Sequence, residues 1–304
     1  MKKELYKVSA VIITHNRLEL LKRAIDSVLG QTFKSLELIV VDDASTDGTR
    51  AYLETLPIRY IHVSQEESRG GNHARNLGIR AAGGEYVAFL DDDDYWLPDK
   101  IEKQVALMER MDCELVHCGR RLEIVEGDNV RFVDCEPNPK HWGDMKKKIL
   151  LTCCTATSSQ IMVKRDALFD VGLFDESLKF WQDYELTIRL AQRKPFYFVN
   201  ELLCVYRINS GDEDRLTNKF FEWRKAVEYI HAKHAELYAT LNPIRKFQVW
   251  LIFVDDARNR SLSAGLKWRY YYYKLLFNVF NFPFRVVGYI RRHLWVNITH
   301  HKQD

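Results

Sequence analysis

Short apolar runs and amphipathic stretches alternate along the first hundred residues, and this alternation restricts the fold more than any other feature of the sequence. The apolar runs, which are typical of buried strands, are Val8–Thr14, Glu37–Val41, Ile58–His62 and Tyr86–Leu90. The stretches with apolar residues at three- and four-residue spacing, typical of amphipathic helices, are Leu18–Leu29, Asp47–Leu56 and Asn72–Ala82. Strands that alternate with helices in this way predict an α/β fold whose doubly wound, mostly parallel sheet is flanked by helices.

The pattern changes after Asp94. Pro98 suits the first turn of a helix that reaches Met111, because its fixed φ and missing N–H are tolerated there. A strand-like run begins at Leu115. The elements expected beyond it are a hairpin joining Glu123–Val125 to Arg131–Val133, a strand at Ser159–Val163, a helix at Asp183–Gln192, and strands at Phe196–Val199 and Leu203–Arg207.

The C-terminal part differs from the rest in both pattern and charge. From Asp212 onward the pattern is almost entirely helical, with breaks at Asn242-Pro243 and at Pro283, so a helical appendage is expected. From Arg260 to the end, eight basic residues stand against one acid, which gives this tail a charge of +7 and the remainder −4. Such a split suggests that the tail faces an anionic surface.

The cysteines and the apolar segments bear on the cellular compartment. The six cysteines follow no leader and show no repeated CxxC spacing, so reduced thiols in a cytosol are expected. The apolar stretch near the N-terminus is too short for a signal peptide. Leu275–Ile290 is interrupted by polar residues and Pro283, and so falls short of a bilayer-spanning helix. We expect a cytoplasmic protein that can lie on the inner face of the cytoplasmic membrane without crossing it.

Four adjacent carboxylates, Asp91–Asp94, follow the apolar run that ends at Leu90. Like charges this close repel unless a cation neutralises them, and hard oxygen ligands suit Mg²⁺ or Mn²⁺ that is also held by phosphate. The alternative is a solvated acidic turn in which one Asp caps the next helix. A second acidic pair, Asp42-Asp43, ends another strand, and Ser45 and Thr46 after it can cap a helix or bind a base or ribose.

These motifs resemble those of family 2 glycosyltransferases of the GT-A fold, a family with many bacterial polysaccharide and lipopolysaccharide sugar transferases. The matching segments are Val11–Arg17, Ser27–Phe33, Glu37–Thr49, Ala74–Gly78 and Gly84–Asp94. The resemblance runs from Val8 to about Ser210. It implies a GT-A catalytic domain at 1–210, with a nucleotide-binding half at 1–111 and an acceptor half at 112–210, and leaves a basic and aromatic helical region at 211–304.

On the donor side, the resemblance implies a set of residues that contact a nucleotide sugar. They are Thr14, His15, Asn16, Arg17, Asp43, Arg75, Asp91 and Asp92. His15 stands where the family usually has an aromatic residue against the uracil, Asp43 would accept from the base, and Arg75 would lie near the diphosphate. Asp91–Asp93 match the DxD element, in which Asp93 is the principal metal ligand and Asp91 or Asp92 contacts ribose, or the metal through water. The implied cofactor is Mn²⁺ or Mg²⁺.

On the acceptor side, Val171–Glu176 followed by Trp181–Leu186 resembles the family's GxFDE…ED element. The Asp of that element, here Asp183, is the implied catalytic base, and it can also be read as a helix N-cap. Gln182 stands where the family usually has Glu, which removes a charge beside the acceptor. The implied acceptor-side residues are Thr157, Ser158 and Gln182.

The resemblance as a whole implies an inverting, metal-dependent hexosyltransferase. It would move a sugar from a nucleotide diphosphate donor, UDP-hexose or UDP-N-acetylhexosamine, to a hydroxyl of a glycan acceptor, lipid-linked or free, in cell-surface polysaccharide synthesis. The alternatives are a non-catalytic nucleotide- or glycan-binding module and a sugar nucleotidyltransferase. The sequence lacks the Gly- and basic-residue-rich phosphate loop that the nucleotidyltransferase would need, and the presence of both Asp93 and Asp183 favours a transferase over a binding module.

The tail mixes basic and aromatic residues, above all in Lys267–Lys274. This mixture suits a lipid interface, where aromatic rings and long cationic side chains lie at the headgroups. The alternatives are an aromatic core of a helical subdomain and a homo-oligomer contact. Base stacking would also use aromatic and basic side chains, but we expect no nucleic-acid partner.

Overall fold

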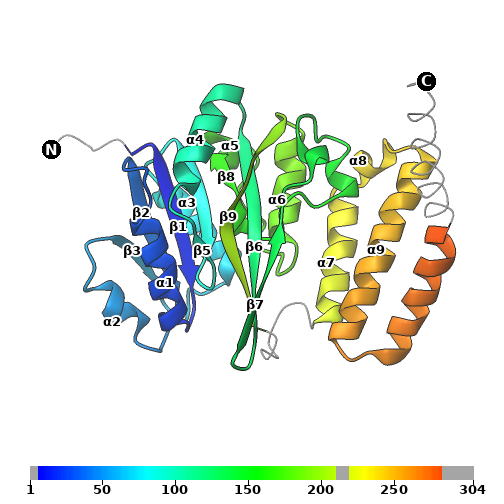
Figure 1. The fold of residues 1–304 in the computed structure, drawn as a ribbon, viewed down its shortest axis with the longest axis horizontal. Coiled ribbons are helices and arrows are strands. Elements are labelled where there is room, and N and C mark those ends of the chain that lie inside the picture. The colour runs from blue at the N-terminus through cyan, green and yellow to red at the C-terminus, as the bar shows by residue number, and fades with distance from the viewer. Residues whose placement is uncertain (1–5, 210–218, 283–304) are drawn as a thin grey trace, which may run out of the picture. The chain divides into compact units, whose positions relative to one another are not determined.

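The computed structural model describes residues 6–209 and 219–282 of the 304-residue chain (Figure 1). The chain divides into two units, Met1–Asp212 and Glu213–Asp304. The first unit contains a nine-stranded mixed sheet with the order β3-β2-β1-β4-β8-β6-β9-β5, in which β7 pairs with β6. The described part of the second unit is helical.

Parallel strands form the first half of the sheet, as expected from the sequence. They are β1 (Val8–Thr14), β2 (Leu36–Asp43), β3 (Arg59–Val63) and β4 (Tyr86–Asp91). The helices between them are α1 (Leu18–Leu29), α2 (Thr49–Leu53) and α3 (Gly71–Ala81). The bounds of β1 and α1 are those expected, whereas α2 is shorter than the expected Asp47–Leu56 because Gly48 opens it and Glu54 ends it.

Helices cover both faces of these strands, which explains why the strands are apolar along their whole length. Leu21 and Ile25 of α1 belong to the same buried cluster as Ile12 and Val40. On the opposite face, Gly78 of α3 lies so close to Val11 that an added Cβ would come within 2.3 Å of a valine methyl. Each buried Ile or Leu side chain contributes about 1.5–3 kcal/mol, so the two layers fix the carboxyl ends of β1, β2 and β4 firmly.

The second half of the sheet is mixed. Its elements are β5 (Tyr95–Trp96), α4 (Lys100–Met111), β6 (Leu115–Glu126), β7 (Asn129–Cys135), β8 (Met162–Lys164), α5 (Arg165–Asp170), α6 (Gln182–Ala191) and β9 (Phe196–Asn209), with short 3₁₀ turns η1 (Pro139–His141), η2 (Ile149–Leu151) and η3 (Ser158–Gln160). The expected hairpin is present, since Glu126 pairs with Asn129 across Gly127-Asp128. Strand β8 pairs antiparallel with both β4 and β6 and so joins the two halves.

Two strand predictions in this half are wrong, and α4 begins at Lys100, after Pro98, with Asp99 as its N-cap. Ser159–Val163 is not one strand, because the hydroxyl of Ser159 bonds to Asp94 and to the backbone N–H of Asp91 and holds a 3₁₀ turn before β8 begins. Phe196–Val199 and Leu203–Arg207 are not two strands but parts of β9. The polar residues between them fall at register shifts around Gly119 of β6, so a bulge absorbs them and the pairing continues.

The second unit contains α7 (Phe220–Lys233), α8 (Ala235–Ala239), α9 (Pro243–Ser263) and a helix at 267–282. The expected break before α9 is present: the Asn242 side chain accepts from the backbone N–H of Arg245, and Pro243 occupies the first turn. The expected break at Pro283 lies outside the described residues. Within 6–209 and 219–282, no helix combines the length and the apolar character needed to cross a membrane.

Candidate active site

The loops after β1 and β2 are fastened to each other by hydrogen bonds. Asn16, in the left-handed region at φ 53°, accepts from the backbone N–H of Thr46 at 2.7 Å and donates its own backbone N–H to Ser45 Oγ at 2.9 Å. The Nδ1 atom of His15 lies 2.5 Å from the carbonyl oxygen of Asp43. Neither Ser45 nor Thr46 caps α2, whose N-cap is Gly48. The first two strand ends therefore form one preorganised wall of the site.

The two acids that end β2 are in different environments. Asp42 is fully buried and bonded, since it accepts from the backbone N–H of Ser45 at 3.0 Å and lies 2.9 Å from His62 Nδ1. Asp43 is also buried, but its Oδ1 atom has no hydrogen-bond partner within the described parts of the chain. A buried carboxylate oxygen without a donor is costly. Asp43 therefore presents an acceptor that an incoming N–H group can satisfy, whereas Asp42 supports the loop.

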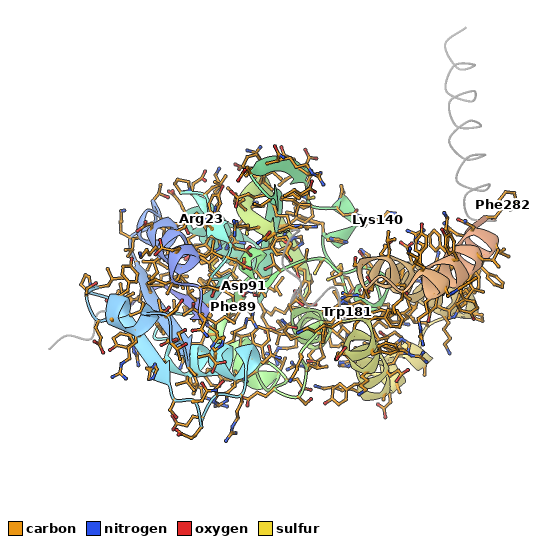
Figure 2. The ribbon with its side chains drawn as sticks, turned by 90° about the horizontal axis from the view of Figure 1, so that it is seen from below. Arg23, Phe89, Asp91, Lys140, Trp181 and Phe282 are labelled. Carbon is orange, nitrogen blue, oxygen red and sulfur yellow. The ribbon has the colours of Figure 1, made fainter. Side chains whose placement is uncertain are left out.

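Asp91–Asp94, at the end of β4, do not form a solvated acidic turn, because two of the four are buried and none caps the next helix. Asp92 and Asp94 are buried, and Asp94 accepts from Ser159 Oγ at 2.6 Å and from the backbone N–H of Arg207 at 3.1 Å. None of the four caps α4, whose N-cap is Asp99. Asp91 is the last residue of β4, and Figure 2 shows it with Phe89 of the same strand near the middle of the first unit.

Two arginines reach this cluster from different elements. Arg75 of α3 donates to Asp91 Oδ1 at 2.6 Å. Arg17, which follows β1, donates to Asp92 Oδ1 at 3.2 Å and to Asp93 Oδ2 at 2.9 Å. Thr14 at the end of β1 also donates to Asp92, at 2.8 Å. The structure thus brings Thr14, Arg17 and Arg75 to these carboxylates, whereas His15 and Asn16 bond to the end of β2 and the loop after it.

These two arginines outweigh the effect of burial on the pKa at only one of the four carboxyl groups. Burial raises the pKa of Asp92 to about 6, and the neighbouring charge of Asp93 adds to the shift. Burial and the charge of Asp91 raise the pKa of Asp93, and burial with the charges of Asp93 and Asp91 raises that of Asp94 well above its usual value. Burial acts on Asp91 too, but Arg75 and the hydroxyls of Ser158 and Thr157 outweigh it and lower the pKa. Three of the four carboxyl groups therefore hold a proton more readily than an exposed Asp, and a further cation at this strand end would favour their ionised forms.

The donor set of the cluster fits a hard divalent cation. Carboxylate oxygens are the ligands that Mg²⁺ and Mn²⁺ prefer, and Asp93 is among the more exposed of the four carboxylates, with 29% of its side chain accessible. In the described parts of the chain, no group of three or more His, Cys, Asp or Glu side chains is arranged to hold a metal. A cation here would therefore need ligands from a bound phosphate or water in addition to the protein.

Two asparagines of α3 hold the loop that precedes α6 close to β4. Asn76 donates to the carbonyl of Phe174 at 3.0 Å and to Glu176 Oε1 at 2.9 Å, and Asn72 donates to the carbonyls of Asp175 and Leu178 at 2.8 and 2.7 Å. The ring of Phe174 packs edge-on against Phe89 with centroids 5.3 Å apart. These bonds hold the 174–178 loop, and with it the start of α6, beside the end of β4.

Asp183 lies in the first turn of α6 but is not its N-cap. Trp181, in the left-handed region at φ 54°, is the cap residue, so the reading of Asp183 as a cap alone is wrong. Asp183 Oδ1 accepts from the backbone N–H of Tyr184 at 2.9 Å. Burial raises the pKa of Asp183, the charge of Arg75 opposes this, and that of Asp91 adds to it. Asp183 is therefore within electrostatic reach of the strand end where the donor-side residues gather.

The proposed acceptor-side hydroxyls point to the acidic cluster. Thr157 Oγ1 donates to Asp91 Oδ2 at 3.1 Å, and Ser158 Oγ donates to Asp91 Oδ1 at the same distance. Both side chains are buried. Gln182 is half-buried in the first turn of α6, next to Asp183. An acceptor contact for any of these three residues stays a prediction.

Arg207 belongs to this region and was not indicated by the sequence. Its charge lowers the pKa of Asp93 against the larger effects of burial and Asp91, and its guanidinium lies 3.5 Å from Glu123. Arg207 comes from β9, far along the chain from β4, so no local pattern connects the two. The signal that could have found it is a cationic residue at the end of the expected strand Leu203–Arg207.

The sequence is similar to known glycosyltransferases. The model of Glycosyl transferase family 2 matches residues 9–176, more than half of the chain. An uncharacterized glycosyltransferase of Rickettsia typhi is 33% identical over 228 residues, covering 69% of this chain and 67% of that protein. TuaG of Bacillus subtilis, a glycosyltransferase assigned to teichuronic acid biosynthesis, is 32% identical over 234 residues, covering 74% of this chain and 89% of that protein.

Solved structures share the fold at lower identity. Residues 1–349 of S. aureus TarS in complex with UDP-GlcNAc superpose with a TM-score of 0.56 at 16% identity, covering 92% of this chain and 91% of that chain. The mannosyltransferase PcManGT of Pyrobaculum calidifontis, in complex with GDP-Man and Mn²⁺, gives a TM-score of 0.56 at 20% identity, covering 91% of this chain and 85% of that chain. Given the family match, the relatives that are one-third identical and this shared architecture, the chain belongs to glycosyltransferase family 2 and has the GT-A fold.

Proposed function

We propose that this protein is an inverting glycosyltransferase that moves a sugar from a nucleoside diphosphate to a hydroxyl of a glycan acceptor in cell-surface polysaccharide synthesis. The observation that carries the proposal is the position of Asp183, a half-buried carboxylate within electrostatic reach of Asp91 and Arg75 at the end of β4. A base beside a diphosphate-binding edge is what transfer to a hydroxyl requires. The relation of TuaG to teichuronic acid synthesis supports a cell-surface product.

The nucleotide would bind where β1 and β2 end. The unpartnered Oδ1 of Asp43 can accept the imide N–H of uracil, and His15 lies beside it, fixed on the Asp43 carbonyl. Arg75 would face the diphosphate. The likeness to TarS, which was solved with UDP-GlcNAc, supports a UDP-sugar donor.

The cation requirement is part of the proposal. Mn²⁺ or Mg²⁺ bound at Asp93 would neutralise charge on the departing diphosphate. The gathering of four carboxyl groups around the partly exposed Asp93 supports this role, as does the Mn²⁺ in the PcManGT complex. Arg17 already bonds to Asp93, so this arginine would share the carboxylate with the cation or turn to the phosphates.

The chain's own part in the chemical step falls to Asp183. The acceptor oxygen forms a bond to the anomeric carbon while the bond from that carbon to the phosphate oxygen breaks, and the acceptor proton passes to the carboxylate of Asp183. A single displacement of this kind inverts the anomeric centre. Burial raises the pKa of Asp183 and makes it a better proton acceptor than an exposed Asp.

The second unit is proposed to touch the membrane from the cytoplasmic side. Its helix at 267–282 exposes large aromatic and aliphatic side chains, among them Trp268 and Tyr271 at 89% and 60% of their surface, beside Lys267 and Lys274. Exposed apolar surface rimmed by lysines suits anionic lipids. An acceptor carried on a lipid would then lie in the same membrane that the enzyme touches.

The experiment that tests the function is a donor screen. UDP release would be measured with UDP-glucose, UDP-galactose and the corresponding N-acetylhexosamines, and with GDP-mannose, each with Mn²⁺ or Mg²⁺. We expect release from a UDP-sugar that stops on addition of EDTA. Tight UDP-sugar binding without any turnover, on every donor and with cell-envelope glycans supplied as acceptors, would favour the non-catalytic binding module instead.

A further inference from the structure

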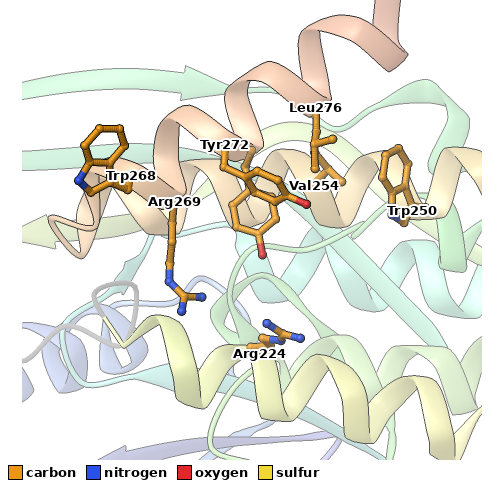
Figure 3. Close-up of a pocket in the computed structure, with 8 residues that line it drawn as sticks. Arg224, Trp250, Val254, Trp268, Arg269, Tyr272 and Leu276 are labelled. Carbon is orange, nitrogen blue, oxygen red and sulfur yellow. The ribbon is translucent and has the colours of Figure 1, made fainter.

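The second unit contains a pocket of about 590 Å³ that combines cations with aromatic walls (Figure 3). Arg224 comes from α7, Trp250 from α9, and Trp268, Arg269 and Tyr272 from the helix at 267–282. Figure 3 shows the two arginines extending from facing helices into the same space. All of these residues belong to the second unit, so the pocket does not depend on the first unit.

The two arginines are available to an anion. Within residues 6–209 and 219–282, Arg269 contacts no carboxylate, and its guanidinium lies over the ring of Phe221 with 4.9 Å to the centroid. Arg224 forms an ion pair with Glu228 at 2.9 Å, one turn along the same helix. Both members of that pair are exposed, so the bridge is worth little and yields readily to a stronger partner. The pocket thus holds more positive than negative charge.

An exposed apolar stripe runs along the helix at 267–282. Its members follow at three- and four-residue spacing and are Trp268, Tyr271, Leu275, Val279 and Phe282, each more than half exposed. At 100° per residue, the pocket residues Arg269, Tyr272 and Leu276 lie on one flank of this stripe, and Lys267 and Lys274 lie on the other. An apolar face bordered by cations on both sides has the form of a helix that lies in a lipid interface.

We propose that this pocket binds the phosphate headgroup of an anionic membrane lipid. The stripe would enter the interface, Arg269 and Arg224 would donate to the phosphate oxygens, and Trp250 and Tyr272 would pack against the apolar part of the same molecule. Guanidinium groups suit phosphate because their planar N–H groups match its oxygens in pairs. The inference rests on the proposed membrane contact and is independent of the proposed sugar transfer.

Vesicle flotation of the full chain separates this site from general attraction to negative surfaces. Phosphatidylcholine vesicles would carry either phosphatidic acid or oleate, adjusted to the same zeta potential. Arg224→Gln/Arg269→Gln should weaken binding to the phosphatidic acid vesicles about tenfold more than binding to the oleate vesicles, because two phosphate contacts are lost. The matched control, Lys267→Gln/Lys274→Gln, removes the same charge and should weaken binding to both vesicles equally.

Arg269→Lys keeps the charge and loses the paired geometry, so it should weaken binding to phosphatidic acid vesicles and leave binding to oleate vesicles unchanged. Unchanged circular dichroism and UDP release in all variants would show that the fold and the first unit are intact. Equal losses for the two double variants on both vesicles would overturn the proposal. So would binding of inorganic phosphate without vesicle binding, which would point to a free anion, or self-association that buries the stripe and prevents flotation.

Discussion

Arg75 donates from Nη2 to Oδ1 of Asp91 at 2.6 Å and thereby joins α3 to the end of β4. The charges of both residues act on the carboxylate of Asp183, in opposite directions. The proposed base is thus electrostatically connected to the edge where the diphosphate would bind. A substitution on the donor side should weaken UDP binding. A substitution of the base should lower turnover and leave UDP binding unchanged.

Replacing Asp183 by Asn removes the proton acceptor and keeps the size of the side chain. We expect turnover to fall by about 10²–10⁴-fold, the usual contribution of a positioned base. UDP affinity measured by calorimetry should stay the same. Gln182→Glu, next to it on α6, serves as the control, because it changes charge without removing a base. Normal turnover in Asp183→Asn would reject this residue as the base.

The acid limb of the pH–rate profile should reflect Asp183. Burial raises its pKa, with Asp91 adding, and the base works only when deprotonated. Activity at saturating Mn²⁺ should therefore fade at a pH above the ordinary Asp value of 3.8 as pH decreases. For the same reason the folded state binds this proton more tightly than the unfolded state, so this residue favours folding more as pH falls.

Urea unfolding at several pH values tests the same shift independently. Asp183→Asn should be more stable than the natural protein at neutral pH, because an uncharged amide avoids the cost of burying a charge. The difference should shrink as the pH falls through the raised pKa. A variant less stable than the natural protein at neutral pH would contradict the raised pKa.

Asp93→Asn should weaken metal-dependent UDP binding. The variant keeps a group that can pair with Arg17 but lowers the charge on the ligand, so calorimetric titration of UDP should show little difference with and without Mn²⁺. The matched control is Asp99→Asn, because Asp99 lies outside the cluster, at the start of α4. If Asp93→Asn kept the full Mn²⁺ effect on UDP affinity, the metal role would belong to another residue.

The proposed hydrogen bond from uracil to Asp43 can be tested by changing the nucleobase as well as the protein. Asp43→Ala should weaken UDP binding by about 10–100-fold, as expected for loss of a hydrogen bond to a charged group. The natural protein should bind N3-methyl-UDP as weakly as the variant binds UDP, and the variant should not distinguish the two nucleotides. Equal affinity of the natural protein for both nucleotides would show that the free Oδ1 does not face the imide N–H.

Gly78→Ala tests the close packing that positions α3. The added methyl would stand 2.3 Å from Val11 Cγ1, so the helix or the strand must shift. Overpacking of this kind costs about 1–3 kcal/mol, measured as the free energy of unfolding in urea. Arg80→Ala, exposed on the same helix, should have little effect. Equal stability of both variants would mean that the contact relaxes freely.

Local pattern predicted most elements of the first ninety residues, although α2 is shorter than expected. Hydrophobic periodicity depends only on neighbours in the chain, so it located β1 and α1 with the observed bounds and placed Thr14, Asp43 and Asp91 at strand ends. Parallel strands put their carboxyl ends at one edge, so the order of strands and helices indicated where a ligand would bind. The donor-side roles came from the family resemblance and stay predictions.

Long-range contacts decided the rest. The break expected within β9 disappears because β6 pairs with it through a bulge, and Ser159 turns the chain because Asp94 accepts its hydroxyl. The pairing of Arg17 with Asp93 and the nearness of Asp183 to Asp91 join segments far apart in sequence. Hydrogen bonds and charge interactions of this kind depend on distance in space, and the periodicity of a sequence contains no information on that distance.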